Sequence, residues 1–285
     1  MGKFITGKNL ENAVYEIIWE AEQNLLIVSP FIKLDDYFIR LFDNHLNNPN
    51  LHILIVFGKN EREISRSLSK NDFDYFKKFL NISIVYVSNL HAKYYGNEKK
   101  GVITSINLYD YSFKNNVEFG VYSETNILSK FTKNADDEAY QTCYELAEKS
   151  EAIYIKRPVY EKKLLSSLLG KNYIKSDVLY DTTDKFYSSL NRNKLSDIKT
   201  LNDFPFELEL GAESKSRPKR EEIEYPTNGF CIRTGEQIAF NIKKPFSYQA
   251  YKSWASFGNE DYPEKFCHRT GKPSHGKTSM RKPIL

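Results

Sequence analysis

The first half of the chain alternates between helical and strand-like spacings of its hydrophobic residues. Over 10–21, 38–46 and 73–80 they recur every three or four positions, which predicts amphipathic helices. Continuous apolar runs over 25–28, 51–57 and 82–87 predict buried strands. Strands separated by helices in this way indicate an α/β layer structure with parallel strand pairing.

The spacing between predicted elements tightens after residue 88. Three short strands joined by turns are predicted, over 90–95, 102–105 and 117–122. A helix is predicted over 136–149, with Cys143 one helical turn from Ala139 and Ala147. This placement favours a buried packing thiol over a nucleophile. Further helix and strand are predicted over 158–189.

We divide the chain into a main domain over 1–190, a linker over 191–228 and a small module over 229–285. The linker is polar, and its stretch 213–224 mixes both charges densely around Pro218. The net charge of the whole chain is +4, but residues 225–285 hold ten Lys and Arg against four Asp and Glu. A basic and aromatic end of this kind favours a nucleic-acid partner.

The sequence also predicts the compartment. No apolar run approaches the ~18 residues that a membrane-spanning helix needs, so no membrane association is expected. The N-terminus lacks the apolar core of a signal peptide. Three cysteines are too few and odd in number for a disulfide framework, which suits a reducing compartment. We therefore expect a cytoplasmic protein.

Polar residues interrupt the three short strands at regular positions. His91 and Lys93 stand two positions apart, as do Ser105 and Asn107, and Glu118 lies in the third strand. On a strand, residues two apart share one face, so each strand delivers polar groups at one end of the sheet. In such an apolar framework each group costs several kcal/mol unless it is paired or used. These five residues are therefore the candidate catalytic residues.

Their chemistry suits a phosphodiester. Near neutral pH an imidazole such as that of His91 serves as a neutral nucleophile or as a protonated acid. Lys93 supplies positive charge to the non-bridging phosphate oxygens, and the Asn107 amide donates hydrogen bonds to them. Glu118 is expected to accept a hydrogen bond from the far ring nitrogen of His91. No metal and no cofactor is required, because Lys93 and Asn107 neutralise the charge.

These residues resemble the motif of the phospholipase D superfamily. That motif reads His-x-Lys, then Ser-x-Asn, then an acidic residue on the following strand, and the similarity includes Ser29-Pro30-Phe31 and covers roughly 7–160. The resemblance implies a mixed sheet flanked by helices. It also implies hydrolysis through a phosphohistidine on His91.

Two departures from the family pattern indicate a branch. The family usually has an Asp after the lysine, whereas here 94–97 lead to Glu98, and Thr104 replaces the glycine before the serine. This variant resembles the single-motif nuclease branch, which includes metal-independent restriction endonucleases. The family reaction needs two histidines, one attacking and one protonating the leaving oxygen. With one motif per chain, a homodimer with a composite active site is implied.

The C-terminal module carries an internal repeat. Residues 230–235 and 266–271 share the pattern Phe-Cys-x-Arg-Thr-Gly, which resembles the Cys-x-x-Cys-Gly knuckle of a zinc ribbon with Thr in place of the second Cys. The module thus looks like a degenerate zinc ribbon. The sequence does not say whether Cys231, Cys267, His268 or His275 hold a residual ion. Contact with nucleic acid, support of a dimer and packing on the main domain remain open as its role.

One further motif is set aside. Residues 271–278 match the phosphate-binding loop of nucleotide-binding proteins letter for letter. That loop follows a buried strand and opens a helix, whereas here a knuckle turn precedes the match and the chain ends soon after it. No nucleotide binding is predicted from it.

The sequence therefore predicts a hydrolase, most simply a metal-independent nuclease acting on DNA (favoured) or RNA. The alternatives are a phospholipid phosphodiesterase with the same chemistry and a catalytically silent nucleic-acid-binding protein. The basic end of the chain and the lack of membrane-binding features favour the nuclease. Sequence or structure specificity and the biological pathway are not encoded in these patterns.

Overall fold

The computed structural model describes residues 2–59, 64–109, 116–124, 135–161, 171–188, 198–210 and 226–285. The chain divides into two compact units, Met1–Lys219 and Arg220–Leu285. Of the predicted linker, 191–197 and 211–225 lie outside the described residues.

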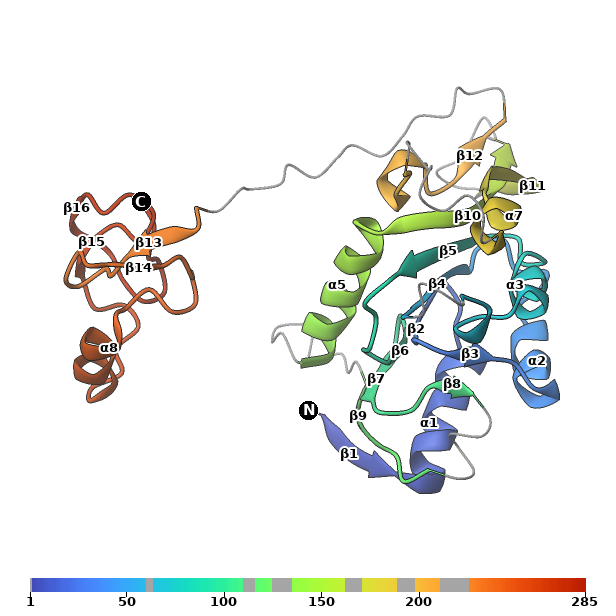
Figure 1. Cartoon of the computed structure of the whole chain (residues 1–285), viewed down its shortest axis with the longest axis horizontal. Helices are drawn as coiled ribbons and strands as arrows, with labels where there is room; N and C mark the ends of the chain where they lie inside the picture. Colours follow the sequence, from blue (N-terminus) through green and yellow to red (C-terminus); the bar gives the residue numbers. More distant parts are fainter. Residues whose placement is uncertain are drawn as a thin grey trace. The chain divides into compact units, whose positions relative to one another are not determined.

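A large mixed sheet forms the centre of the first unit (Figure 1). Its strands follow one another across the sheet as β1 (Lys3–Thr6), β9 (Phe119–Glu124), β7 (Lys100–Thr104), β6 (Tyr94–Asn97), β2 (Asn24–Val28), β4 (His52–Gly58), β5 (Ile82–Val87), β10 (Glu151–Glu161) and β11 (Asn172–Asp181), with β12 (Leu208–Glu209) beside β10. Strands β2, β4 and β5 are parallel, and the strands on either side of them pair antiparallel. The predicted α/β class with a mixed sheet flanked by helices is confirmed.

Helices cover both faces of the sheet, which explains why the parallel strands are apolar throughout. Because side chains alternate along a strand, Ile27 and Ile55 face one core while Val28 and Val56 face the other. The first core contains α1 (Gly7–Trp19), α2 (Asp36–Asp43) and α3 (Lys70–Phe76), with η1 (Ile64–Arg66) and α7 (Thr183–Tyr187) at its margin; the second contains α5 (Ala135–Glu148) and η4 (Leu201–Asp203) (Figure 1). Cys143 is buried in the second core, as expected of a packing thiol. Among the described residues, no helix is both long and apolar enough to cross a membrane.

Two parts of the sheet differ from the sequence-based expectation. The region over 158–189 holds strand and helix as predicted, in β11 and α7, but β10 already begins at Glu151 and forms a long antiparallel pair with β11. Residues 198–210 were assigned to the polar linker, yet Leu201 and Phe204 are buried against the sheet and Leu208 pairs with Val159. A few apolar residues in a polar segment do not produce a periodic pattern, so their packing is decided by the surface that the sheet offers.

The C-terminal unit is built from two similar hairpins. They comprise β13 (Asn228–Phe230) with β14 (Gln237–Ala239) and β15 (Glu264–Phe266) with β16 (Pro273–Thr278), and α8 (Tyr248–Ala255) lies between them in sequence. Two reciprocal hydrogen bonds join the repeats. The Phe230 N–H donates to the His268 carbonyl and the Phe266 N–H donates to the Ile232 carbonyl, both at 2.8 Å. The two knuckles are therefore related by an approximate two-fold repeat.

The knuckle glycines are required by this arrangement. Gly235 and Gly271 have φ angles of +76° and +67°, which L side chains rarely adopt. A Cβ atom on Gly235 would lie 3.2 Å from the Phe266 ring, and one on Gly271 would lie 2.8 Å from the Phe230 ring. The aromatic ring of each repeat thus packs over the turn of the other.

Cys231 and His268, two of the residues considered as metal ligands, make hydrogen bonds within the unit. Burial raises the pKa of the Cys231 thiol, but hydrogen bonds from Thr234 and from the Ser247 N–H outweigh it and leave the pKa below its usual value. His268 is buried; its Nε2 accepts from the Asn241 N–H at 2.9 Å, so its Nδ1 donates to the Phe230 carbonyl at 2.7 Å. In the part of the chain that the structure describes, no group of three or more His, Cys, Asp or Glu residues is arranged to hold a metal ion.

The phosphate-loop match over 271–278 has the structure of a hairpin arm. Residues Pro273–Thr278 form β16, paired with β15. No helix follows it among the described residues to 285.

Arg157 on β10 bonds to residues of the parallel strand β5, and these bonds lead to a stability prediction. Its fully buried guanidinium donates to the carbonyls of Ile82 and Pro205 at 3.0 and 2.9 Å, and to Ser83 Oγ at 2.7 Å. We expect Arg157→Met to lower the free energy of unfolding by roughly 3–5 kcal/mol, because buried acceptors lose a charged donor. Urea unfolding measures this.

The matched control is Lys175→Met, which removes an exposed ion pair with Asp177 on β11. We expect it to change the free energy of unfolding by less than about 1 kcal/mol. Equal effects of the two substitutions would contradict the role of Arg157.

Candidate active site

The strand order brings the candidate residues to one edge of the sheet. Val28 at the end of β2 pairs with Tyr94 at the start of β6, and Tyr94 pairs with Ile103 near the end of β7. Thr104, the last residue of β7, pairs with Gly120 near the start of β9. The carboxyl ends of β2, β4, β5 and β7 therefore meet the amino ends of β6 and β9. The direction of the chain reverses beside β2, and ligands of open α/β sheets bind at such points.

His91 and Lys93 lie just outside the sheet rather than in a strand. We expected a strand over 90–95, but β6 begins at Tyr94, and His91 is exposed in an extended segment before it. The Leu90 N–H donates to the Val87 carbonyl at 3.3 Å, which closes the turn after β5. The Lys93 carbonyl accepts from the Thr104 N–H at 3.2 Å and so fixes the end of the segment. The segment that contains His91 thus crosses this edge of the sheet, and His91 is exposed to solvent.

A second lysine, which the sequence patterns did not single out, joins this group. Lys59 follows β4 directly and has a φ angle of +97°. Its N–H donates to the Val87 carbonyl at 3.3 Å, and Gly58 allows this close approach because a Cβ there would lie 1.8 Å from the same oxygen. The signal in the sequence is a Gly-Lys pair at the carboxyl end of a buried strand.

The two lysines set the electrostatics of the site. The positive charge of Lys93, and then that of Lys59, lowers the pKa of His91 below its ordinary value. Burial and the charge of Lys59 lower the pKa of Lys93, and the carboxylate of Glu118 opposes this shift. A lowered pKa means that more of the His91 imidazole is neutral near pH 7. The same charges attract an anion to the edge.

Glu118 is held by Ser105, the residue that follows β7, and by Asn116. Its carboxylate accepts a hydrogen bond from Ser105 Oγ and one from Asn116 Nδ2, the latter at 3.2 Å. Ser105 Oγ in turn accepts from the Phe119 N–H at 3.2 Å. Among the described residues, no hydrogen bond joins the His91 ring to Glu118, although one was expected. The Glu118 carboxylate therefore exerts its electrostatic effect on Lys93.

Asn107 lies in the loop after β7, which is clamped to the end of β2. Ser29 is fully buried; its Oγ accepts from the Leu108 N–H at 3.1 Å and donates to the Phe31 carbonyl at 2.7 Å. The Tyr95 hydroxyl donates to the Ile106 carbonyl at 2.9 Å. Within the described part of the chain, the buried Oδ1 of Asn107 has no hydrogen-bond partner. Buried polar atoms of this kind need an explanation, and a bound group is one.

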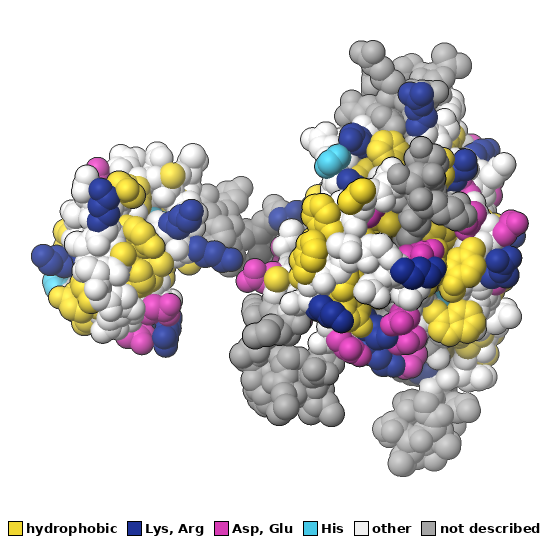
Figure 2. Space-filling view, turned by 90° about the horizontal axis from the view of Figure 1, so that it is seen from below, with side chains coloured by type: hydrophobic (Ala, Val, Ile, Leu, Met, Phe, Trp, Pro, Cys, Tyr) yellow, Lys and Arg dark blue, Asp and Glu magenta, His cyan; other side chains and the backbone are white. Residues whose placement is uncertain are grey.

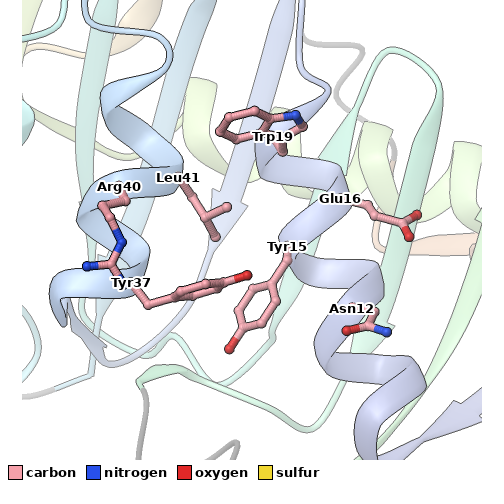
Figure 3. Close-up of a pocket in the computed structure, with 7 residues that line it drawn as sticks. All are labelled: Asn12, Tyr15, Glu16, Trp19, Tyr37, Arg40 and Leu41. Carbon is pink, nitrogen blue, oxygen red and sulfur yellow. The ribbon is translucent and has the colours of Figure 1, made fainter.

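The described residues of this unit border three surface hollows, of which two are used below. The first, which we call the Asn107 hollow, has a volume of about 550 Å³ and is lined by Phe31, Ile32, Lys33, Arg66, Asn107 and Tyr109. The second, the α1–α2 groove, has a volume of about 740 Å³, and Figure 3 shows the Tyr15 and Tyr37 side chains between its two helices. Of the three, as far as their described lining residues go, the Asn107 hollow alone includes a candidate catalytic residue.

The other residues considered at the sequence level lie elsewhere. Glu98, to which residues 94–97 lead after the lysine, follows β6 at the opposite edge and accepts hydrogen bonds from the backbone of 22–24. His52 Nε2 lies 2.9 Å from Ser83 Oγ, so it has the local partner expected of a strand residue. Buried His45 bonds to the Ile18 carbonyl at 2.7 Å. Each of these residues has a structural partner away from His91.

Comparison with known proteins gives similarity at the level of solved structures. No family model and no curated protein matches the chain. NucT from Helicobacter pylori is similar at 12% identity and a TM-score of 0.41, over 53% of this chain and 97% of NucT. Nuc from Salmonella typhimurium, a phospholipase D family member, is similar at 11% identity and a TM-score of 0.38, over 53% of this chain and 98% of Nuc. A phosphatidylserine synthase from Haemophilus influenzae Rd KW20 is similar at 13% identity and a TM-score of 0.39, over 53% of this chain and 39% of the synthase.

The charge arrangement predicts a measurable shift at His91. We expect the pKa of its imidazole to lie below that of an ordinary histidine and to rise in Lys59→Gln, because one of the two charges that oppose protonation is removed. NMR titration of the ring protons reports this pKa directly.

The control is Lys99→Gln, since the Lys99 ammonium donates to Glu22 at the opposite edge. We expect no change in the titration of His91 there. A His91 pKa that is the same in wild type and in Lys59→Gln would refute the electrostatic account.

Proposed function

We propose that the protein is a metal-independent phosphodiesterase, and more specifically a nuclease that acts through a phosphohistidine on His91. The observation that carries the proposal is an exposed imidazole whose pKa is lowered by two lysines at one sheet edge. A neutral imidazole is nucleophilic, and the ammonium groups that keep it neutral also bind the anionic substrate. The resemblance to the motif of the phospholipase D superfamily agrees with this assignment.

The reaction follows from these groups. A ring nitrogen of His91 attacks phosphorus, the nitrogen–phosphorus bond forms, and the bond to the leaving oxygen breaks. An imidazolium protonates that oxygen and, as the neutral base, later takes a proton from the water that hydrolyses the phosphohistidine. The ammonium groups of Lys59 and Lys93 and the Asn107 amide stabilise the charge on the non-bridging oxygens. Ser105 is a positioning residue, which orients the Glu118 carboxylate that compensates Lys93.

The second imidazole comes from another copy of the chain. One His-x-Lys motif supplies one histidine, and the other histidines of the first unit, His45 and His52, have structural partners. An exposed apolar strip borders the site: Val117, Phe119 and Phe4 are 97%, 52% and 65% exposed. A strip of this kind beside a half-complete site suits a two-fold contact that brings two copies of His91 together.

Nucleic acid is the substrate class that the rest of the chain favours, with DNA first. The C-terminal unit exposes Tyr248, Tyr251 and Phe257, and Figure 2 shows hydrophobic side chains on its surface with Lys and Arg around them. Cations next to aromatic side chains suit phosphates next to bases. A phospholipid phosphodiesterase and a catalytically silent nucleic-acid-binding protein are the competing functions. Turnover of the two substrate classes distinguishes them.

The first test is cleavage in the presence of excess chelator. We expect wild-type protein to cleave DNA under these conditions and His91→Ala to lose at least about 10³-fold in rate, because it lacks the nucleophile. The measurement is a gel assay of labelled single- and double-stranded DNA and RNA, with His52→Gln as the matched control.

The alternative results are decisive. Cleavage retained by His91→Ala would exclude the proposed nucleophile, and cleavage lost on chelation would exclude metal independence. Turnover of phospholipid without any cleavage of nucleic acid would support the lipid enzyme instead.

The composite site predicts a non-linear effect of mixing subunits. When equal amounts of wild-type and His91→Ala chains are refolded together, we expect about a quarter of the wild-type activity per total chain, because a working site needs two intact histidines. Independent monomers would give about a half. Mixing wild type with Tyr37→Leu serves as the control for refolding losses.

A further inference from the structure

The Asn107 hollow adjoins the proposed catalytic edge and has its own chemistry. Lys59, whose charge lowers the pKa of His91, also lies with its Nζ 5.7 Å from the centre of the Phe31 ring. Phe31 lines the hollow, and so does Asn107. The hollow therefore contains one candidate catalytic residue, Asn107, and one ring, Phe31, that lies beside Lys59.

The walls of the hollow are fixed by backbone pairing. Strand β3 (Ile32–Lys33) pairs in parallel with β8 (Leu108–Tyr109), which places Lys33 beside Tyr109. The Ile32 N–H also donates to the Ser67 carbonyl at 2.7 Å, next to Arg66 in sequence. Three separate segments are thus joined around one space, so the hollow is a property of the folded sheet edge.

The lining combines flat rings with cations. Phe31 and Tyr109 supply aromatic surfaces, and Lys33 and Arg66 supply positive charge, with Lys33 Nζ 5.2 Å from the centre of the Tyr109 ring. None of the described lining residues is acidic. Aromatic faces next to ammonium and guanidinium groups are the arrangement that proteins use for bases and phosphates of single strands.

The size and the hydrogen-bonding groups of the hollow limit the class of ligand that it can bind. A volume of about 550 Å³ accepts one small molecule or one nucleotide and excludes a double helix. The unpartnered Asn107 Oδ1 needs a donor, and a base provides a ring N–H or amino group together with a flat face for Phe31 or Tyr109, which a glycerol-linked lipid headgroup lacks.

We infer that the Asn107 hollow is a subsite for the base of an unpaired nucleotide adjacent to the scissile phosphate. This inference rests on the proposed function and adds that the substrate strand is single-stranded or locally unstacked at the cleavage point. The base stacks on Phe31 or Tyr109 and donates a hydrogen bond to Asn107. Lys33 and Arg66 contact the neighbouring phosphate.

The test compares two chromogenic diesters on the full-length protein. Thymidine 5′-(p-nitrophenyl) phosphate carries a base, and bis(p-nitrophenyl) phosphate does not. We expect the ratio of kcat/KM for the first to kcat/KM for the second to fall about tenfold in Tyr109→Leu and in Phe31→Leu, mainly through KM. Tyr109→Trp, which keeps an aromatic face, is expected to retain the ratio.

The matched control is Tyr37→Leu in the α1–α2 groove, where an aromatic ring also lies beside a cation, with Arg40 5.8 Å from the ring centre (Figure 3). The ratio is expected to stay at the wild-type value in this variant. A ratio that is unchanged in Tyr109→Leu, or that falls equally in Tyr37→Leu, overturns the subsite while leaving the proposed function intact.

Binding of thymidine 5′-monophosphate, measured by calorimetry, separates the two ideas. Saturable binding that weakens about tenfold in Tyr109→Leu supports the subsite even if neither diester is hydrolysed, in which case only the proposed function fails. No saturable binding to wild type, or equal competition by glycerol 3-phosphate, overturns the subsite whatever the hydrolysis shows.

Discussion

The reversal of chain direction between β5 and β6 is the constraint on which the site depends. Three parallel strands bring their carboxyl ends to one edge, and the chain then turns back so that β6 pairs antiparallel with β2. The residues that make this crossing include His91 and Lys93, which therefore leave the sheet instead of joining it. Several backbone groups of this edge pair with one another, since the Lys59 and Leu90 N–H groups donate to the Val87 carbonyl and the Thr104 N–H donates to the Lys93 carbonyl. The side chains of His91 and Lys93 are therefore not required to pair this backbone.

Charge at this edge works against stability and in favour of anion binding. Lys59 and Lys93 each lower the pKa of His91, and Lys59 also lowers the pKa of Lys93. Like charges held close together destabilise the free protein, and an anion relieves that repulsion. Glu118 compensates part of the charge through Lys93, but Ser105 holds its carboxylate toward β7. The unbalanced positive charge of this edge thus favours the binding of an anion.

The C-terminal unit is held together by hydrogen bonds and aromatic packing between its two repeats. In both repeats the cysteine thiol receives hydrogen bonds from a threonine and from backbone N–H groups, which lower the pKa of Cys231 and of Cys267 against the opposing effect of burial. The His268 ring is tied at both nitrogens and stacks on Phe240 with centroids 4.7 Å apart. Reciprocal aromatic–glycine packing between the two turns adds the core that so small a unit needs.

The sequence by itself determined the elements and the chemical character of the site. Alternating and continuous apolar patterns report burial residue by residue, so the helices and parallel strands of the first half were predictable, and polar residues at the ends of apolar runs marked His91, Lys93, Ser105, Asn107 and Glu118. Only the tertiary structure decided which of these groups act on one another. Lys59, at the end of β4, lowers the pKa of His91, Glu118 accepts a hydrogen bond from Ser105, and Phe31 and Tyr109 line one hollow. A local pattern records how each residue meets its surroundings, whereas contacts between distant segments follow from strand order and register, which are set by the packing of the whole sheet.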